Sequence, residues 1–140
     1  MNLYAESSAV LAWLMGEADA RMVRRHLSVA DRVISSDLTL VECDRVLYRC
    51  LAIGSVSEAE IAERQALLSK AAASWNVMRM DWRVIERARQ PFPVEPVRTL
   101  DALHLASALC ARSALPGLSL LSLDQRVLNN ARRLGFTVLS

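Results

Sequence analysis

The feature that most constrains the fold is an alternation, along the whole chain, of short apolar segments with longer segments of helical character. The apolar segments are mostly uninterrupted runs, which is typical of strands that are buried on both faces of a sheet. The expected strands span residues 1–5, 32–35, 75–80, 118–123 and 136–140. Because one or two helices separate consecutive strands, the pattern predicts an α/β fold with a parallel sheet covered by helices on both faces.

Capping and helix-breaking residues mark where the intervening helices begin and end. Gly16 and Gly54 are expected to end two of them, and Ser57 with Glu60 forms a capping box at the start of a third. Asp81 is expected to cap a short helix that the proline-rich segment PFPVEP cannot continue. The expected helices span about residues 7–15, 19–29, 57–73, 82–89, 98–113 and 125–134, with another from the SSDLT segment to about residue 53.

The composition fits one soluble globular domain, and we expect residues 1–140 to form it. Hydrophobic residues make up 53% of the chain and charged residues 23%, and the net charge of +2 is too small to indicate a partner. No apolar run is long enough to cross a membrane, and the segment MNLYAESS lacks the features of a secretory signal. Cys43, Cys50 and Cys110 are odd in number and form no CxxC motif, so we expect reduced, mostly buried thiols in a cytoplasmic protein.

Four acidic residues occupy corresponding places near strand ends or helix starts. Glu6 follows the first expected strand, and Glu42 lies in the first turns of the helix after the second strand. Asp101 opens the apolar helix that precedes the LSLLSL strand, and Asp124 follows that strand. Ligands of open parallel sheets bind beyond the carboxyl ends of the strands, where the strand order reverses. We therefore expect these four side chains to converge.

All four acids also have a purely structural explanation, which for Asp101 is that its charge complements the dipole of the helix that it opens. Glu6 is favoured by the positive end of the helix that it begins, and Asp124 fits the N-cap of the last helix. Glu42 forms a possible capping box with Thr39, and it is also placed to pair with Arg45 one turn later.

The fourth acid, Asp101, stands in the segment RTLDALHLASAL, which is apolar on nearly every face of a helix. A buried charge without a partner is costly, so Asp101 must face solvent, cap the helix or meet a cation. His104 lies one turn further on, and we expect it to be a core residue hydrogen-bonded to the backbone rather than a metal ligand.

Taken together, four converging carboxylates favour a divalent cation. Crowded carboxylates repel each other and raise each other's pKa, and a hard cation such as Mg²⁺ removes that penalty. Such a site suits metal-assisted hydrolysis of a phosphodiester, in which the ion activates a water molecule and stabilises the charge that grows on the phosphate.

Four segments resemble the PIN domain family, and most closely the single-domain toxic ribonucleases of the VapC type from bacterial toxin–antitoxin pairs. They are YAESSAVLAWLMGE, SSDLTLVECDRVLYR, RTLDALHLASAL and SLDQRVLNNARRLGFTVL, and they stand in the family's order over almost the whole chain. The family's four acids fall on Glu6, Glu42, Asp101 and Asp124, and Ser122 falls where the family often has a hydroxyl residue.

The resemblance implies a three-layer α/β/α sandwich and a Mg²⁺- or Mn²⁺-dependent endoribonuclease. It implies that Glu6, Asp101 and Asp124 bind the metal and that Glu42 completes the catalytic set. It also implies three partners, namely an RNA substrate, a cognate antitoxin that blocks the cleft, and a second copy in a homodimer.

Three further residues are expected to serve the substrate. Ser7 is placed to order Glu6 or the water shell of the metal, and Ser122 stands beside the fourth acid. Arg126 lies two residues beyond Asp124, and we expect it to approach an RNA phosphate.

One departure from the family leaves an alternative open, because Glu6 stands where the family usually has Asp. Glutamate is longer by one methylene group and still ligates Mg²⁺, but small displacements of a catalytic group cost on the order of a hundredfold in rate. The alternative is a degenerate PIN domain that binds RNA or a protein without cleavage. A phosphorylated signalling receiver also gathers acids at strand ends, but it needs a lysine after a late strand, and the only lysine, Lys70, lies in a mid-chain helix.

Overall fold

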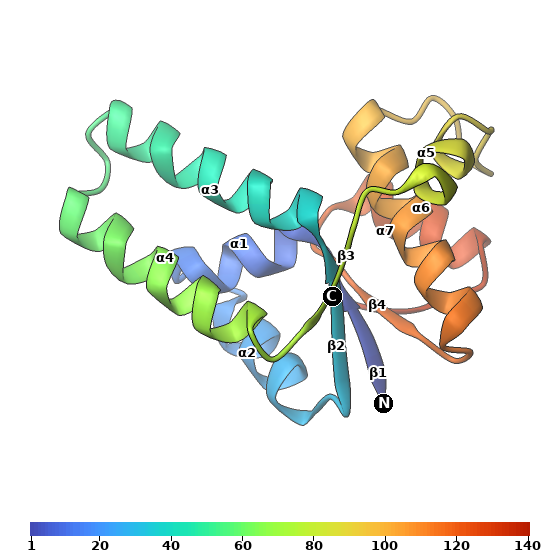
Figure 1. Ribbon diagram of the computed structural model, residues 1–140, viewed down its shortest axis with the longest axis horizontal. Helices are drawn as coiled ribbons and strands as arrows, with labels where there is room; N and C mark the ends of the chain where they lie inside the picture. The colour runs from blue at the N-terminus through green and yellow to red at the C-terminus, as the bar shows by residue number, and fades with distance from the viewer.

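Five parallel strands form the centre of the protein in a computed structural model that describes residues 1–140 (Figure 1). The strands are β1 (Asn2–Ala5), β2 (Arg32–Ser36), β3 (Asn76–Met78), β4 (Ser119–Leu121) and β5 (Thr137–Leu139). Each lies within one residue of an expected strand or inside it, and all four pairings are parallel. The predicted parallel α/β sheet is therefore confirmed.

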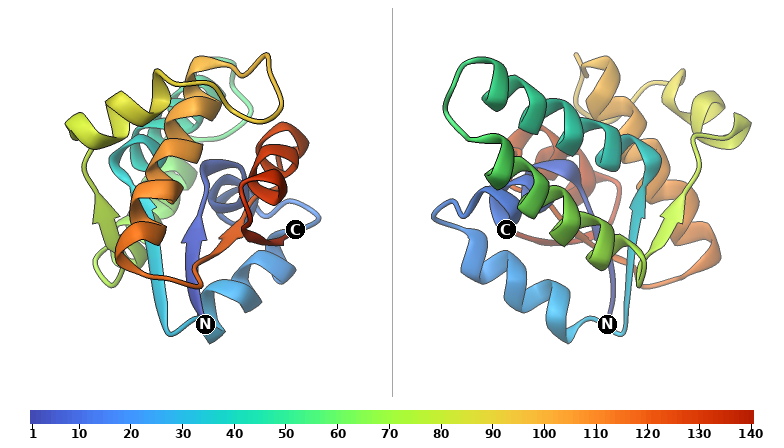
Figure 2. Two further views of the ribbon diagram at one scale, coloured as in Figure 1. Left: turned by 90° about the vertical axis from the view of Figure 1, so that its right-hand side faces the viewer. Right: turned by 60° about the vertical axis from the view of Figure 1, so that its left-hand side comes forward.

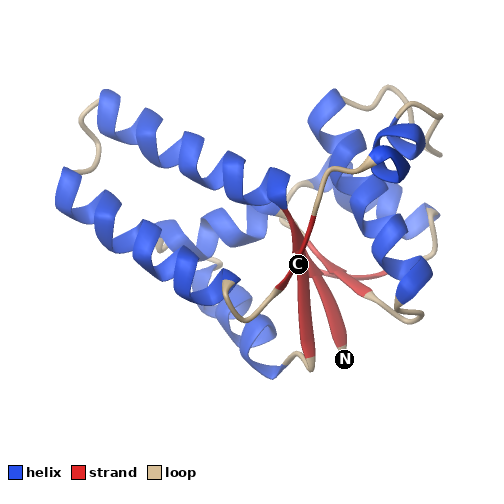
Figure 3. Ribbon diagram, in the orientation of Figure 1, coloured by secondary structure: helices blue, strands red, loops and turns tan.

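Seven helices connect the strands and cover both faces of the sheet (Figure 3). They are α1 (Ser7–Met15), α2 (Ala20–Val29), α3 (Asp37–Ala52), α4 (Glu58–Ala72), α5 (Trp82–Ala88), α6 (Thr99–Ala114) and α7 (Gln125–Arg133). Helices α1 to α4 lie on one side of the sheet and α5 to α7 on the other, which gives three layers (Figures 1 and 2). None of these helices combines the length and apolar character that a membrane crossing requires.

The side chains of β1 show why both faces need a cover. Tyr4 points into a core formed with α6 and α7, where it packs with residues such as Leu105 and Leu120. Its neighbours Leu3 and Ala5 point the opposite way and pack against the helices of the other layer. All five side chains are essentially inaccessible to water, and burial of a large apolar side chain contributes about 1.5–3 kcal/mol to stability. Hydrophobic burial on both faces therefore fixes the sheet between its two helical layers.

The strand order is β3-β2-β1-β4-β5, so the order reverses between β1 and β4. Residues Leu3 to Ala5 pair in register with Ser119 to Leu121, and the Glu6 backbone N–H donates to the Leu121 carbonyl at 3.0 Å. The residues that follow β1 and β4 therefore emerge side by side. A parallel sheet offers its ligand crevice at this place.

Helix α3 begins before Thr39, one of the residues expected to cap it. Ser36 is its N-cap and accepts a hydrogen bond from the Thr39 backbone N–H at 3.3 Å. The predicted capping box of Thr39 with Glu42 is therefore wrong, because both residues lie inside the helix. The side chain of Glu42 is left free for another role.

The three cysteines are unpaired, and they differ in burial. Only Cys43 is fully buried, whereas Cys50 and Cys110 are partly exposed, so the expectation of mostly buried thiols is only partly met. Burial, together with the charges of Glu42 and Asp44, raises the pKa of the Cys43 thiol to about 12.

Candidate active site

A cavity of about 750 Å³ opens at the carboxyl ends of β1 and β4, and all four predicted acids line it. Glu6 comes from the end of β1, Glu42 from α3, Asp101 from the first turn of α6 and Asp124 from the start of α7. The fold thus brings together side chains that lie up to 118 positions apart, the separation of residues 6 and 124 in the sequence.

Glu6 is held in a shell of hydroxyl donors. It is the N-cap of α1 and is only 3% exposed. Its Oε1 accepts from the Ser7 hydroxyl at 2.7 Å. Its Oε2 accepts from the Ser122 hydroxyl at 2.8 Å, from the Ser8 backbone N–H at 3.1 Å, and from the Ser8 hydroxyl. Both carboxylate oxygens are therefore fixed in position, and the longer side chain fits the site without an unsatisfied atom.

Glu42 and His104 meet beside Glu6. The Nε2 atom of His104 lies 3.2 Å from Glu42 Oε1 and 3.6 Å from Glu6 Oε1. Ser7 joins this contact, because its hydroxyl lies 3.2 Å from His104 Nε2 and shares its one proton between Glu6 and Glu42. The expected backbone hydrogen bond of His104 is wrong, since Nε2 faces carboxylates and the buried Nδ1 has no partner. His104 is buried as expected, but it belongs to the acid cluster.

The contact between Glu42 and His104 favours opposite charges on the two groups. Burial alone would lower the pKa of His104, but the hydrogen bond with Glu42 and the charge of Glu6 outweigh burial and raise it. Burial alone would raise the pKa of Glu42, but the hydrogen bonds with His104 and Ser7 outweigh burial and lower it.

Asp101 and Asp124 share a cation instead. The Nε of Arg98 donates to Asp101 Oδ2 at 2.9 Å, and its Nη2 donates to Asp101 Oδ1 at 3.3 Å. The same Nη2 lies 3.3 Å from Asp124 Oδ2. Asp101 is 7% exposed, so its charge is buried among apolar neighbours and meets a cation, one of the three solutions that the sequence allowed. Sequence reasoning missed Arg98, although its position three residues before Asp101 was a usable signal.

The four acids therefore form two neighbouring groups in one cavity. Glu6, Glu42 and His104 bring potential ligand atoms within 4.8 Å of one another, whereas Asp101 and Asp124 meet at the Arg98 guanidinium. Asp124 is also the N-cap of α7, as expected, because its Oδ1 accepts from the Arg126 backbone N–H at 2.8 Å.

The three residues expected to serve the substrate lie in different surroundings. Ser7 is buried between Glu6 and Glu42. Ser122 is 0% exposed, donates to Glu6 and accepts from the Asp124 backbone N–H at 3.1 Å. Arg126 is exposed and lines a smaller neighbouring cavity that also reaches Asp101, rather than the acid-lined cavity itself.

The donor set of the cavity fits a divalent cation. Carboxylate oxygens are the ligands that Mg²⁺ and Mn²⁺ prefer, and imidazole nitrogen is a further ligand of transition metals. A positive group already lies between Asp101 and Asp124, which shows that this part of the cavity accommodates a cation. The residues present therefore suit the metal that the PIN resemblance implies.

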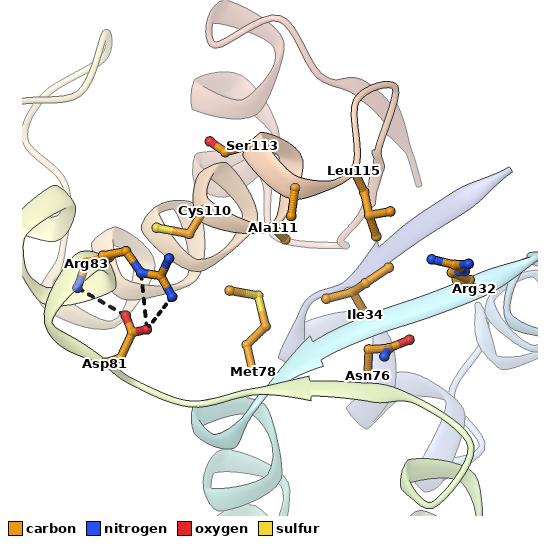
Figure 4. Close-up of a pocket in the computed structure, with 11 residues that line it drawn as sticks. Arg32, Ile34, Asn76, Met78, Asp81, Arg83, Cys110, Ala111, Ser113 and Leu115 are labelled. Atoms are coloured by element: carbon orange, nitrogen blue, oxygen red, sulfur yellow. Dashed lines mark hydrogen bonds and ion pairs between the residues drawn. The ribbon is translucent and has the colours of Figure 1, made fainter.

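A second cavity, of about 470 Å³, lies among β2, β3, α5 and α6 (Figure 4). Its most prominent polar feature is an ion pair in which Arg83 donates to Asp81 at 3.1 Å. None of the predicted site residues lines this cavity. The acid-lined cavity is therefore the candidate for the chemistry.

Comparison with known proteins decides the family, because the model of the PIN domain matches residues 3–134. The chain belongs to the PIN domain family. This PIN domain is 32% identical over 138 residues to ribonuclease VapC46 of Mycobacterium tuberculosis strain H37Rv, an alignment that covers 99% of this chain and 96% of the relative. The resemblance to VapC-type proteins is thereby confirmed.

Solved structures share the fold of this PIN domain. A toxin–antitoxin complex from Klebsiella pneumoniae superposes with a TM-score of 0.64 at 15% identity, over 100% of this chain and 97% of that chain. VapC20 of Mycobacterium tuberculosis, described as a toxin that cleaves the sarcin–ricin loop, gives a TM-score of 0.63 at 15% identity, over 96% and 95% of the two chains. The three-layer sandwich is therefore confirmed as PIN-like.

Proposed function

We propose that this PIN domain is a metal-dependent endoribonuclease, the toxin of a toxin–antitoxin pair, which hydrolyses RNA phosphodiester bonds with a water molecule. The observation that carries the proposal is the cavity lined by Glu6, Glu42, Asp101 and Asp124 at the reversal of the strand order. The identity to ribonuclease VapC46 over nearly the full length of both chains supports the same activity.

The metal ligands in this proposal are Glu6, Asp101 and Asp124, with Glu42 as the fourth acid of the catalytic set. A bound Mg²⁺ or Mn²⁺ ion would supply an activated water molecule and stabilise the negative charge that grows on the phosphate. His104 pairs with Glu42 and Glu6, and its two close contacts orient these carboxylates toward the cavity.

The buried serines act as positioning residues in this proposal. Ser7 and Ser122 donate to the two different oxygens of Glu6, so together they fix the plane of its carboxylate. Ser122 has no exposed surface through which to contact RNA, so we assign it this role rather than substrate binding. Arg126 is exposed beside the cavity, and we assign it a phosphate contact outside the metal site.

The partners in this proposal are an RNA substrate, a cognate antitoxin and a second copy of the chain. Relatives of the same fold were solved as toxin–antitoxin complexes, which supports the antitoxin. An RNA substrate also supports a cytoplasmic location. Size-exclusion chromatography with light scattering of the purified chain tests the homodimer.

The alternative, a PIN domain that binds without cleaving, rested on Glu6. Its carboxylate contacts four donors and lies in the same cluster as Glu42, so the extra methylene does not carry it out of the site. The geometry therefore favours cleavage over the degenerate alternative.

The experiment that tests the proposal is incubation of the purified, antitoxin-free chain with transfer, ribosomal and messenger RNA pools in Mn²⁺ or in chelator. We expect discrete cuts that require the metal. The variant Glu6→Asp, run beside it, is expected to cut no faster than the native chain. Cutting by Glu6→Asp alone would establish the degenerate alternative.

A further inference from the structure

The Arg98 side chain fills the space between two of the proposed metal ligands. It contacts Asp101 through two nitrogen atoms, at 2.9 and 3.3 Å, and Asp124 through one of them, at 3.3 Å. This two-pronged contact is the arrangement in which a guanidinium group binds carboxylates best. Arg98 therefore neutralises in cis the same carboxylates that the proposed function assigns to a metal ion.

Every carboxylate oxygen of these two acids already accepts a hydrogen bond. Both oxygens of Asp101 accept from Arg98. Asp124 Oδ2 also accepts from Arg98, and its Oδ1 accepts from the backbone N–H of Arg126. A divalent cation and a guanidinium group repel each other, so a metal ion that takes these oxygens must displace Arg98 from at least one of them.

Displacement of Arg98 is inexpensive because its side chain is 60% exposed. The released guanidinium is readily hydrated, and the incoming metal ion compensates the buried Asp101 carboxylate, which is only 7% exposed. The hydrogen-bond donors of the Glu6 oxygens are neutral hydroxyl and backbone groups, and the His104 Nε2 atom lies further away, at 3.6 Å from Glu6 Oε1. Arg98 is therefore the cation that faces a metal ion on the Asp101 and Asp124 side of the cavity, whereas His104 lies on the Glu6 and Glu42 side.

We propose that Arg98 competes with the divalent metal ion for Asp101 and Asp124, and that it thereby sets the metal concentration at which the site fills. This inference rests on the proposed metal-dependent function. Arg98 is a positioning residue in this account, since it keeps the two acids together until a metal ion replaces it. Removal of Arg98 is then expected to tighten metal binding, whereas removal of a true ligand weakens it.

Isothermal titration calorimetry with Mn²⁺ tests the competition on the full chain. The variant Arg98→Gln is expected to bind Mn²⁺ roughly threefold to tenfold more tightly than the native chain, the range expected when a competing ion pair with a solvent-exposed cation is lost. The matched control is Arg49→Gln, which removes the same charge from the lining of the same cavity. Arg49 makes no ion pair, so this control is expected to change the affinity by less than about twofold.

Equal or weaker binding by Arg98→Gln, or equal tightening by both variants, would overturn the competition while leaving the metal site intact. Absence of saturable Mn²⁺ binding by the native chain would overturn the competition and the proposed function together. Arg98→Lys keeps the positive charge but loses the planar guanidinium group that donates two hydrogen bonds to Asp101, and it is expected to bind Mn²⁺ with intermediate affinity. If Arg98→Gln does not fold, the Mn²⁺ affinity of Arg98→Lys tests the competition in its place.

A second measurement follows Arg98 itself by ¹⁵N-edited nuclear magnetic resonance of the arginine side chains. The Arg98 Nε–H signal, assigned by its absence from Arg98→Lys, is expected to shift when Mg²⁺ is added, because its hydrogen bond to Asp101 is lost. A signal that stays unchanged at saturating Mg²⁺ would contradict displacement. A merely structural contact between Arg98 and Asp101 predicts no such shift.

Discussion

At the scale of single residues, the buried hydroxyl of Ser122 connects two acids of the cavity, because it donates to Glu6 and accepts from the Asp124 backbone. We expect Ser122→Ala to lower the free energy of unfolding by about 1–3 kcal/mol, since it removes one donor of the buried Glu6 carboxylate and leaves the Asp124 backbone N–H without a partner. Urea denaturation measures this loss. The exposed Ser28, whose hydroxyl donates to Arg25 of its own helix, supplies the control Ser28→Ala, for which less than about 0.5 kcal/mol is expected. Equal losses in both variants would contradict the role of Ser122.

Cys43 supplies a second prediction at this scale. Its thiol is fully buried and its pKa is raised to about 12, so at pH 8 almost none of it is the reactive thiolate. Titration of the folded chain with a thiol reagent at pH 8 is expected to modify Cys43 last, and denaturant is expected to abolish its protection. Modification of Cys43 in the folded chain at the rate of Cys50 would show that the first turns of α3 open readily.

Individual residues also show which features of the site the sequence could predict and which it could not. The convergence of the four acids on one cavity was predictable, because each stands beside a strand end or helix start that the apolar pattern marks. The grouping of the acids was not predictable. The bond of Arg98 to Asp124 spans 26 positions, and the contact of His104 with Glu6 joins two helices that meet only in the folded chain. Such long-range pairings depend on side-chain packing, which the sequence pattern leaves open.

At the scale of elements, α3 links the sheet to the cavity. Ser36 ends β2 and caps α3, and Glu42 lies less than two turns along that helix. The apolar pattern placed the helix correctly, but SSDLT offers several capping residues. Burial of Ser36 at the carboxyl end of β2, which is a tertiary feature, selects that residue.

The cap of α3 provides a prediction with a matched control. Ser36→Ala and Ser57→Ala each remove an N-cap hydrogen bond, at α3 and α4 respectively, and each is expected to cost about 1 kcal/mol of stability. Only Ser36→Ala is expected to weaken Mn²⁺ binding as well, because α3 carries Glu42, whose negative charge lines the cavity, whereas α4 adds no residue to the cavity. Thermal unfolding and calorimetric titration measure the two effects. Equal Mn²⁺ affinities in the two variants would show that the cap does not support the site.

At the scale of the whole molecule, the chain order of the strands accounts for the position of the cavity. The chain builds β1, β2 and β3 outward in one direction and then returns to place β4 on the free side of β1. Alternating apolar strands and helices predicted the parallel sheet, because a crossover helix is what joins parallel strands. The order of the strands does not follow from that alternation alone, and the family resemblance implied the three layers but not the strand order, which the structure supplies.

The whole molecule is proposed to hydrolyse RNA in this cavity with a metal ion that its acidic side chains bind. The most direct test compares the native chain with Asp101→Asn, in Mn²⁺ and in chelator, on an RNA that the native chain cuts. We expect Asp101→Asn to slow single-turnover cleavage by at least about a hundredfold, while its circular dichroism spectrum stays native. Native-rate cutting by Asp101→Asn, or undiminished cutting in chelator, would contradict the account.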